Sequence, residues 1–130
     1  MVQVDGEDII CHGFLRTGEK IVFTNKHLQI LEVQQVQSFE EAGRPKYTRI
    51  SELPIENIEN VYSEVSNISG IAEMVVKLDD GKELRCSFGI LIDNVLFLGR
   101  SIISIPNYNA VVDGHIIEIN TILERKRRKA

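Results

Sequence analysis

Two runs of alternating apolar and polar residues, separated by a short turn, constrain the fold of this chain most strongly. Apolar residues occupy every second position of 74–78 and of 84–88, with Asp79-Asp80-Gly81 between the runs. Apolar partners on neighbouring strands must share a face, and a three-residue turn meets this requirement whereas a two-residue turn does not. We therefore predict a β-hairpin with a type I turn and a bulge, in which Gly81 has a positive φ angle. The predicted pairs are Leu78 with Lys82, Val76 with Leu84, and Met74 with Cys86.

Short strands with turn signals between them account for the rest of residues 8–90. The other strand candidates are 8–15, 20–24, 26–36, 47–53 and 57–65. Pro54 ends one of them because proline cannot donate a hydrogen bond to a central ladder. The polar segment 37–46 is expected to be an exposed loop, and 66–70 a turn.

The periodicity changes after Gly89. Apolar residues recur at spacings of four, three and four in the last quarter of the chain, which predicts an amphipathic helix over 107–125. These residues are Val112, Ile116, Ile119 and Leu123. Gly114 lies inside this helix at a cost of about 1 kcal/mol relative to alanine.

The segment between the hairpin and this helix also shows helical spacing. Val95, Leu98 and Ile102 recur at intervals of three and four, Asp93 is a candidate N-cap, and Pro106 interrupts the pattern. Three interpretations of residues 93–105 remain open: a helical extension, an extra strand or an oligomer contact.

Strands that precede a final helix indicate an α+β domain, a bent antiparallel sheet or barrel with a helix over one end. The length of 130 residues favours a single domain. No run of about 18 apolar residues occurs. Residues 1–24 carry acidic side chains where a signal peptide would be basic, so we expect a cytoplasmic protein.

The net charge of −4 is unevenly distributed. Arg125, Lys126, Arg127, Arg128 and Lys129 lie within the last six residues, and without them ten basic residues face 19 acidic ones, a net charge of −9. An acidic body argues against nucleic acid as a partner, because phosphate binding needs a basic face. The basic tail is either a solvated helix end, whose cations oppose the helix dipole, or a weak contact for anionic lipid.

The residues that could perform catalysis do not form a convincing set. Ser87 and Cys86 lie in a predicted strand without a histidine partner, and the adjacent carboxylates at 40–41 and 79–80 lie in predicted loops. Neither a phosphate-binding glycine loop nor zinc-ligand spacing occurs. We therefore expect no enzymatic activity, no metal and no cofactor, and we interpret Cys11 and Cys86 as reduced core thiols.

Two segments resemble the bacterial pleckstrin-homology-like (PH-like) family. Residues 21–28, IVFTNKHL, look like the apolar-Thr-Asn-Lys-Arg-Leu strand of that family, and residues 53–61, LPIENIENV, are similar to its Pro-led strand opening. The hairpin at 77–81 falls where the family has one. The resemblance covers roughly residues 8–90 and the C-terminal helix, and it implies a strongly bent antiparallel β-barrel of about seven strands capped by that helix. A single domain over 1–130 would then comprise a barrel (8–90), an apolar extension (91–106), the helix (107–125) and the basic tail (125–130).

The chain departs from the family at positions that bear on ligand binding. His27 stands where the family usually has arginine, and the first hairpin lacks the Lys…Arg-x-Arg cluster with which lipid-binding PH domains hold inositol phosphates. Arg16 and Lys20, with Glu19 between them, are at most a weak anion site. We therefore do not expect phosphoinositide recognition.

Residues 90–105 contain more apolar side chains than one stripe on a surface helix can hold, which indicates burial in the core or in an interface. The predicted interaction surface comprises Val95, Leu96, Phe97, Leu98, Ile102 and Ile103. The first functional hypothesis is therefore a protein-interaction module that associates with itself or with another protein. The alternative is a membrane-surface adaptor that uses the basic tail on anionic lipid. A third hypothesis, a carrier of a small apolar ligand in the barrel mouth, requires an empty cavity.

Overall fold

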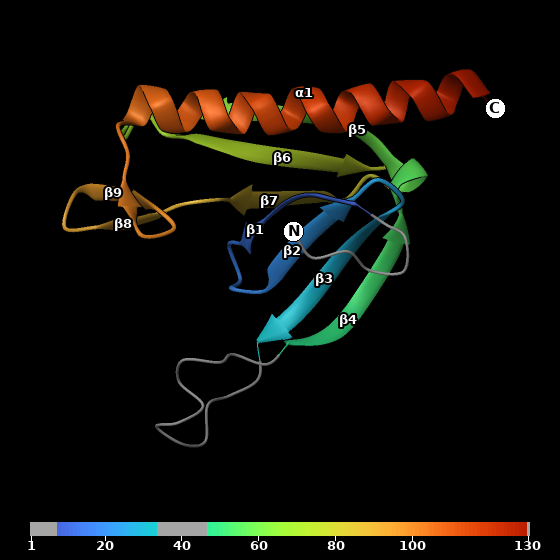
Figure 1. The fold of residues 1–130 in the computed structure, drawn as a ribbon, viewed down its shortest axis with the longest axis horizontal. Coiled ribbons are helices and arrows are strands. Elements are labelled where there is room, and N and C mark those ends of the chain that lie inside the picture. Colours follow the sequence, from blue (N-terminus) through green and yellow to red (C-terminus); the bar gives the residue numbers. More distant parts are fainter. Residues whose placement is uncertain (1–7, 34–46, 130) are drawn as a thin grey trace.

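The computed structural model describes residues 8–33 and 47–129, and the predicted loop at 37–46 lies outside these ranges. The described chain has α+β architecture: a seven-stranded antiparallel sheet in the order β4-β3-β2-β1-β7-β6-β5, with one long helix, α1, packed along it (Figure 1). The strands of this sheet are β1 (Ile9–Leu15), β2 (Lys20–Thr24), β3 (His27–Val33), β4 (Tyr47–Pro54), β5 (Ile58–Val65), β6 (Ala72–Leu78) and β7 (Glu83–Ser87).

The sheet consists of two meanders, β1–β4 and β5–β7, that meet at a short seam. Only two residue pairs join β1 to β7, Phe14 with Ser87 and Leu15 with Cys86. The outer strands β4 and β5 are not paired with each other, so of the two predicted forms, a bent sheet or a barrel, the described residues show a sheet that is not closed. The short 3-10 helix η2 (Ile55–Asn57) links these strands, and α1 covers the core on the side of β5 and β6.

The hairpin between β6 and β7 confirms the predicted register. Met74 pairs with Cys86 and Val76 with Leu84, and the Leu78 amide donates to the Lys82 carbonyl at 2.8 Å. Gly81 has a φ angle of 89°, which is the left-handed region that a residue without a Cβ adopts most readily.

The Thr-Asn-Lys-His segment forms the tight turn between β2 and β3. The buried Thr24 hydroxyl accepts hydrogen bonds from the amides of Lys26, at 3.1 Å, and His27, at 2.8 Å. Thr24 also donates to the His27 carbonyl at 3.2 Å. In this chain, the segment that carries the family resemblance therefore forms a turn whose backbone is stabilised by hydrogen bonds to Thr24.

The C-terminal helix α1 (Ile105–Lys129) confirms the amphipathic pattern and is longer at both ends than the predicted helix. The predicted stripe faces the sheet: Val112, Ile119 and Leu123 are at most 2% exposed, and Ile116 packs beside them. No helix in the described ranges is both long enough and apolar enough to cross a membrane.

Residues 90–102 form a second, three-stranded sheet and not a helical extension. Its strands are β8 (Ile90–Ile92), β9 (Val95–Leu98) and β10 (Ser101–Ile102), in the order β10-β9-β8. Asp93, the expected N-cap, and Asn94 have φ angles of 50° and 66° and form the two-residue turn between β8 and β9. Aspartate and asparagine tolerate this left-handed conformation better than most residues, so they favour a hairpin at this point.

Candidate functional site

The three-stranded sheet of residues 90–102, which we call the lobe, has two chemically similar but differently buried faces. Cross-strand pairing places Phe97 between Ile90 on β8 and Ile102 on β10. Because side chains alternate along a strand, Ile92 and Val95 share this face. We call it the outer face.

Every side chain of the outer face is apolar, and most of them are open to solvent. Ile90 is 57% exposed, Ile92 53% and Ile102 71%, whereas Val95 is 36% exposed. Soluble proteins rarely expose contiguous apolar groups of this kind, and such patches mark interaction sites.

The opposite face of the lobe packs against the main core except at Leu91, which pairs with Leu96 but is 51% exposed at the β8 edge. Leu96 is 6% exposed, and Leu98 and Ile103 are partly buried against the same cluster. The six residues of the predicted interaction surface therefore lie in two places. Val95, Phe97 and Ile102 lie on the outer face, whereas Leu96, Leu98 and Ile103 pack against the core.

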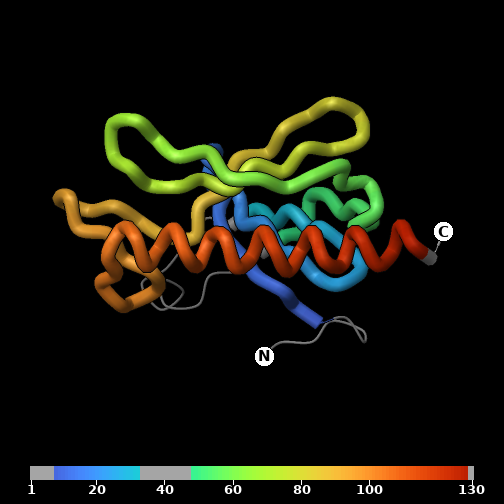
Figure 2. The backbone as a smooth tube through the Cα atoms, turned by 90° about the horizontal axis from the view of Figure 1, so that it is seen from above, coloured from blue at the N-terminus to red at the C-terminus, as the bar shows by residue number. Residues whose placement is uncertain are grey.

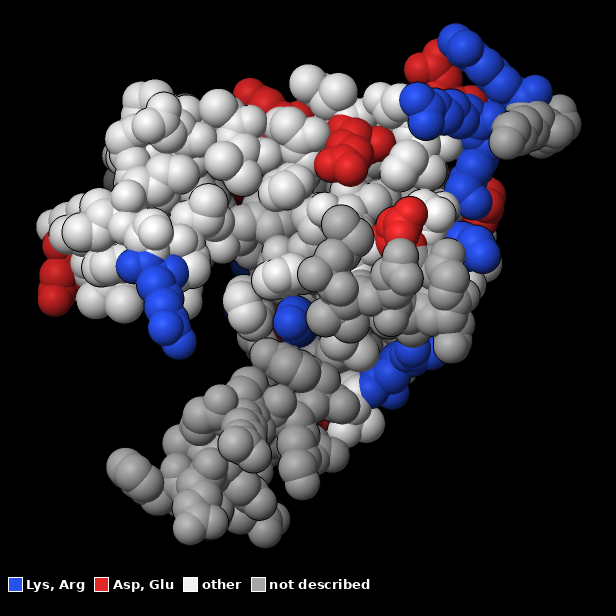
Figure 3. Space-filling model, viewed as in Figure 1, with Lys and Arg blue, Asp and Glu red and all other residues white. Residues whose placement is uncertain are grey.

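The lobe projects from the end of the molecule at which α1 begins (Figures 1 and 2). In the space-filling view it is the largely uncharged region at the left (Figure 3). Asp93 and Arg100 are the only charged residues between positions 87 and 107. The lobe is therefore electrically neutral, whereas the body of the chain is acidic.

A buried tyrosine joins the lobe to the helix. The Tyr108 hydroxyl accepts a hydrogen bond from the Phe88 amide at 2.9 Å and lies 3.1 Å from the Ser87 hydroxyl. Gly89 packs tightly on the same ring, because a Cβ there would lie 2.9 Å from Tyr108 and 2.8 Å from the Phe97 carbonyl oxygen. The segment from β7 to β8 is thereby held in one orientation.

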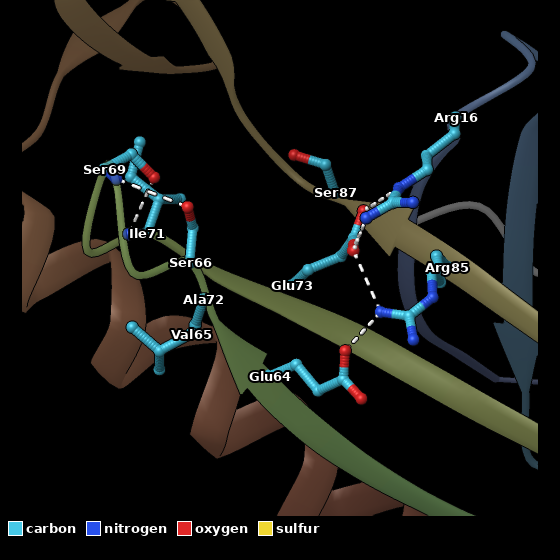
Figure 4. A pocket seen from close by; sticks show the side chains of 10 residues that line it. All are labelled: Arg16, Glu64, Val65, Ser66, Ser69, Ile71, Ala72, Glu73, Arg85 and Ser87. Atoms are coloured by element: carbon cyan, nitrogen blue, oxygen red, sulfur yellow. Dashed lines mark hydrogen bonds and ion pairs between the residues drawn. The ribbon is translucent and has the colours of Figure 1, made fainter.

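A second candidate site is a cleft of about 400 Å³ between the start of the β1–β2 turn and the β5–β6 turn. Two arginines and two glutamates line it, together with serine hydroxyls (Figure 4). Arg16 binds Glu73 through two hydrogen bonds of 2.8 and 2.6 Å. Arg85 contacts Glu73 at 3.4 Å and also pairs with Glu64.

These ion pairs neutralise the cleft. The hydrogen bond from Arg85 lowers the pKa of Glu64, and the same contact is the main cause of a raised pKa of Arg85. An incoming anion would have to displace a carboxylate from a guanidinium, which makes this a weak anion site. Of the predicted pair, Arg16 is already bound to Glu73 on β6, so its charge is neutralised.

The basic end of α1 is docked onto the start of β5 and the preceding turn. Lys126 donates to Glu56 at 2.9 Å, and this bond is the main cause of a lowered pKa of Glu56. Arg127 donates to the carbonyls of Ile58 and Glu59 at 3.0 and 2.5 Å. Arg128 pairs with Glu124 at 2.5 Å, Arg125 is exposed, and the side chain of Lys129 lies outside the description.

The two cysteines are free and buried, as predicted. Burial is the main reason that the pKa of each thiol is raised to about 12. Cys86 contacts the Met74 carbonyl oxygen at 3.6 Å, and its neighbour Ser87 is hydrogen-bonded to the Gly89 carbonyl at 3.0 Å. Neither residue is arranged as an activated nucleophile: the thiolate is disfavoured, and within the described ranges the Ser87 hydroxyl contacts the Gly89 carbonyl and the Tyr108 hydroxyl, neither of which is a general base.

Three residues of the candidate interaction site were absent from the predicted set. Ile90, Leu91 and Ile92 form β8, and all three are more than half exposed. The signal that could have found them is Asp93-Asn94, a dipeptide suited to a two-residue hairpin between two apolar runs. Comparison of the chain with protein-family models and with curated protein sequences gives no match.

Proposed function

We propose that this chain is a non-enzymatic, cytoplasmic PH-like module for protein assembly, and that it associates with itself through the lobe. The observation that carries this proposal is the outer face, an uninterrupted apolar surface on a sheet that stands out from the body. Exposed apolar area costs about 25 cal/mol per Å². Association recovers this cost for the part of the surface that lies at the contact.

A second copy suits this surface because the lobe is electrically neutral. The body carries an excess of acidic residues, so most contacts between two copies bring like charges together. A contact through residues 87–107 brings together only one positive and one negative residue from each copy. Self-association is therefore least opposed by charge at the lobe.

The open seven-stranded sheet with a helix along one side is compatible with the PH-like architecture that the family resemblance implies. At the turn between β1 and β2, the described residues lack the basic cluster with which lipid-binding members hold their ligand. Arg16 is held by Glu73, and the other charged groups of the cleft, Arg85 and Glu64, are paired in the same network.

The apolar lobe is favoured over the basic tail as the functional surface. Lys126, Arg127 and Arg128 bind groups of this chain, so lipid would compete with contacts already made. The two surfaces also lie at opposite ends of the 25-residue helix α1, about 37 Å apart. A membrane that the tail touches leaves the lobe free.

Sedimentation velocity over a wide range of protein concentrations tests the proposal. The wild-type chain should show a sedimentation coefficient that rises with concentration, and the double substitution Ile90→Thr, Ile92→Thr should weaken association about tenfold or more. The matched control is Ile117→Thr, because Ile117 is 66% exposed but lies on α1. A wild-type chain that stays monomeric, or equal effects of the lobe and control substitutions, would contradict the proposal.

A further inference from the structure

We propose that two copies of this chain join by antiparallel pairing of their β8 strands about a two-fold axis at Leu91, forming one six-stranded sheet. This inference rests on the proposed self-association and specifies its geometry. The partner that pairs with the β8 edge is a second copy of this chain.

The first argument is that, among the described strands, none pairs with the outer edge of β8. It is the outer strand of the lobe, and Ile90, Leu91 and Ile92 are 57%, 51% and 53% exposed. Edge strands of soluble proteins are usually blunted by charged residues, proline or a covering element. β8 consists of isoleucine and leucine alone.

The second argument is the direction of the Leu91 backbone groups. In a hairpin with a two-residue turn, the flanking pair Ile92–Val95 exchanges hydrogen bonds, so the next pair, Leu91–Leu96, does not. The Leu96 carbonyl accordingly accepts from the Ile103 amide, away from β8, at 3.0 Å. The N–H and C=O of Leu91 therefore point away from β9, along the free edge.

The third argument is that this edge is complementary to itself. Antiparallel pairing about Leu91 places Leu91 opposite its own copy, where the two residues exchange both backbone hydrogen bonds. Ile90 of each copy then lies opposite Ile92 of the other, so every side-chain contact is apolar on apolar. A one-residue shift of register would instead place Asp93 opposite Ile90 in one direction and Ile92 opposite Gly89 in the other, so either shift loses an apolar pair.

Charge and area also suit this arrangement. The two-fold axis puts Asp93 of one copy at the same end of the joint sheet as Arg100 of the other, about 12 Å away across the strands. The pairing of three residues buries less than the roughly 1,200 Å² of a stable interface. We therefore expect an association that depends on concentration and not an obligate dimer.

Cysteine cross-linking of the full chain distinguishes this geometry from other contacts. In the paired strands the two Leu91 Cα atoms lie about 5.5 Å apart, within the roughly 4.4–6.8 Å that a disulfide spans. The matched control is Ile102→Cys, because Ile102 is more exposed but is separated from its copy by five strand spacings, about 24 Å. The native thiols are buried and have a raised pKa, so they react slowly.

With oxidised glutathione at equal protein concentration, Leu91→Cys should form a disulfide-linked dimer at least tenfold faster than Ile102→Cys. Equal rates, or faster linkage of Ile102→Cys, in a chain that self-associates in the centrifuge would overturn β8 pairing and leave the proposed assembly function standing. Equal rates in a chain that is monomeric at all concentrations would overturn both.

Discussion

Removal of one hydroxyl group at Tyr108 should destabilise the chain measurably, because that group serves a buried backbone amide. Tyr108 is fully buried, and its hydroxyl oxygen accepts from the Phe88 amide at 2.9 Å. In Tyr108→Phe the ring still fills its site, but the amide is left without this partner.

The expected magnitude follows from that single loss. An unsatisfied buried donor costs about 1–3 kcal/mol. The second contact of the hydroxyl adds little, because Ser87 retains its hydrogen bond to the Gly89 carbonyl. For a chain of 130 residues, 1 kcal/mol corresponds to roughly 4 °C in melting temperature, so the decrease should be about 4–12 °C.

Urea unfolding and thermal melting at low protein concentration measure this change. The matched control is Tyr62→Phe, because the Tyr62 hydroxyl makes only an exposed 3.5 Å contact with Glu83. The control should remain within about 0.5 kcal/mol of the wild type. Equal stabilities of the two variants would refute the role assigned to the Tyr108 hydroxyl.

Three further predictions concern turns and titrating groups. Gly81→Ala should cost about 1 kcal/mol because of the φ angle of 89°, whereas Gly114→Ala, with open space around it on α1, should stabilise the chain by about 1 kcal/mol; urea midpoints that shift in the same direction would contradict this. Lys126→Met should raise the pKa of Glu56 in an NMR titration, and a pKa that does not move would show that the ion pair is absent in solution. In the wild type, this pair stabilises the fold above the ordinary pKa of 4.5. That stabilisation should disappear as pH falls through the lowered pKa of Glu56. The pKa of Cys86 is raised from 9.0 to about 12, so the protonated thiol stabilises the fold fully below pH 9 and this contribution is lost toward pH 12. Urea midpoints should therefore fall more steeply above pH 9 in the wild type than in Cys86→Ala. Parallel curves would refute the assignment.

The parts of the fold that the sequence predicted are those in which local rules and tertiary packing agree. The register of β6 and β7 follows from matched parity and one glycine, and the buried stripe of α1 follows from spacing. Closure of the sheet could not be derived in this way. It depends on whether β4 and β5 meet, which no local pattern encodes.

The lobe shows how two periodicities can be confused. The spacing of Val95, Leu98 and Ile102 fits a helix, but the structure distributes these residues over two faces of a sheet. Apolar residues occupy nearly every position here, so periodicity alone cannot separate helix from strand. The turn at Asp93-Asn94 decides between them, and the exposure of β8 follows only once the strand order is known.

The most direct test of the central claim is amide hydrogen exchange of the wild-type chain at dilute and at high protein concentration. Association through the lobe predicts that exchange slows with concentration in peptides covering β8 and β9. Exchange along β4, the exposed edge of the large sheet, should stay constant. Exchange rates in the lobe that do not change with concentration, or slowing that is confined to β4 or to the end of α1, would contradict the account.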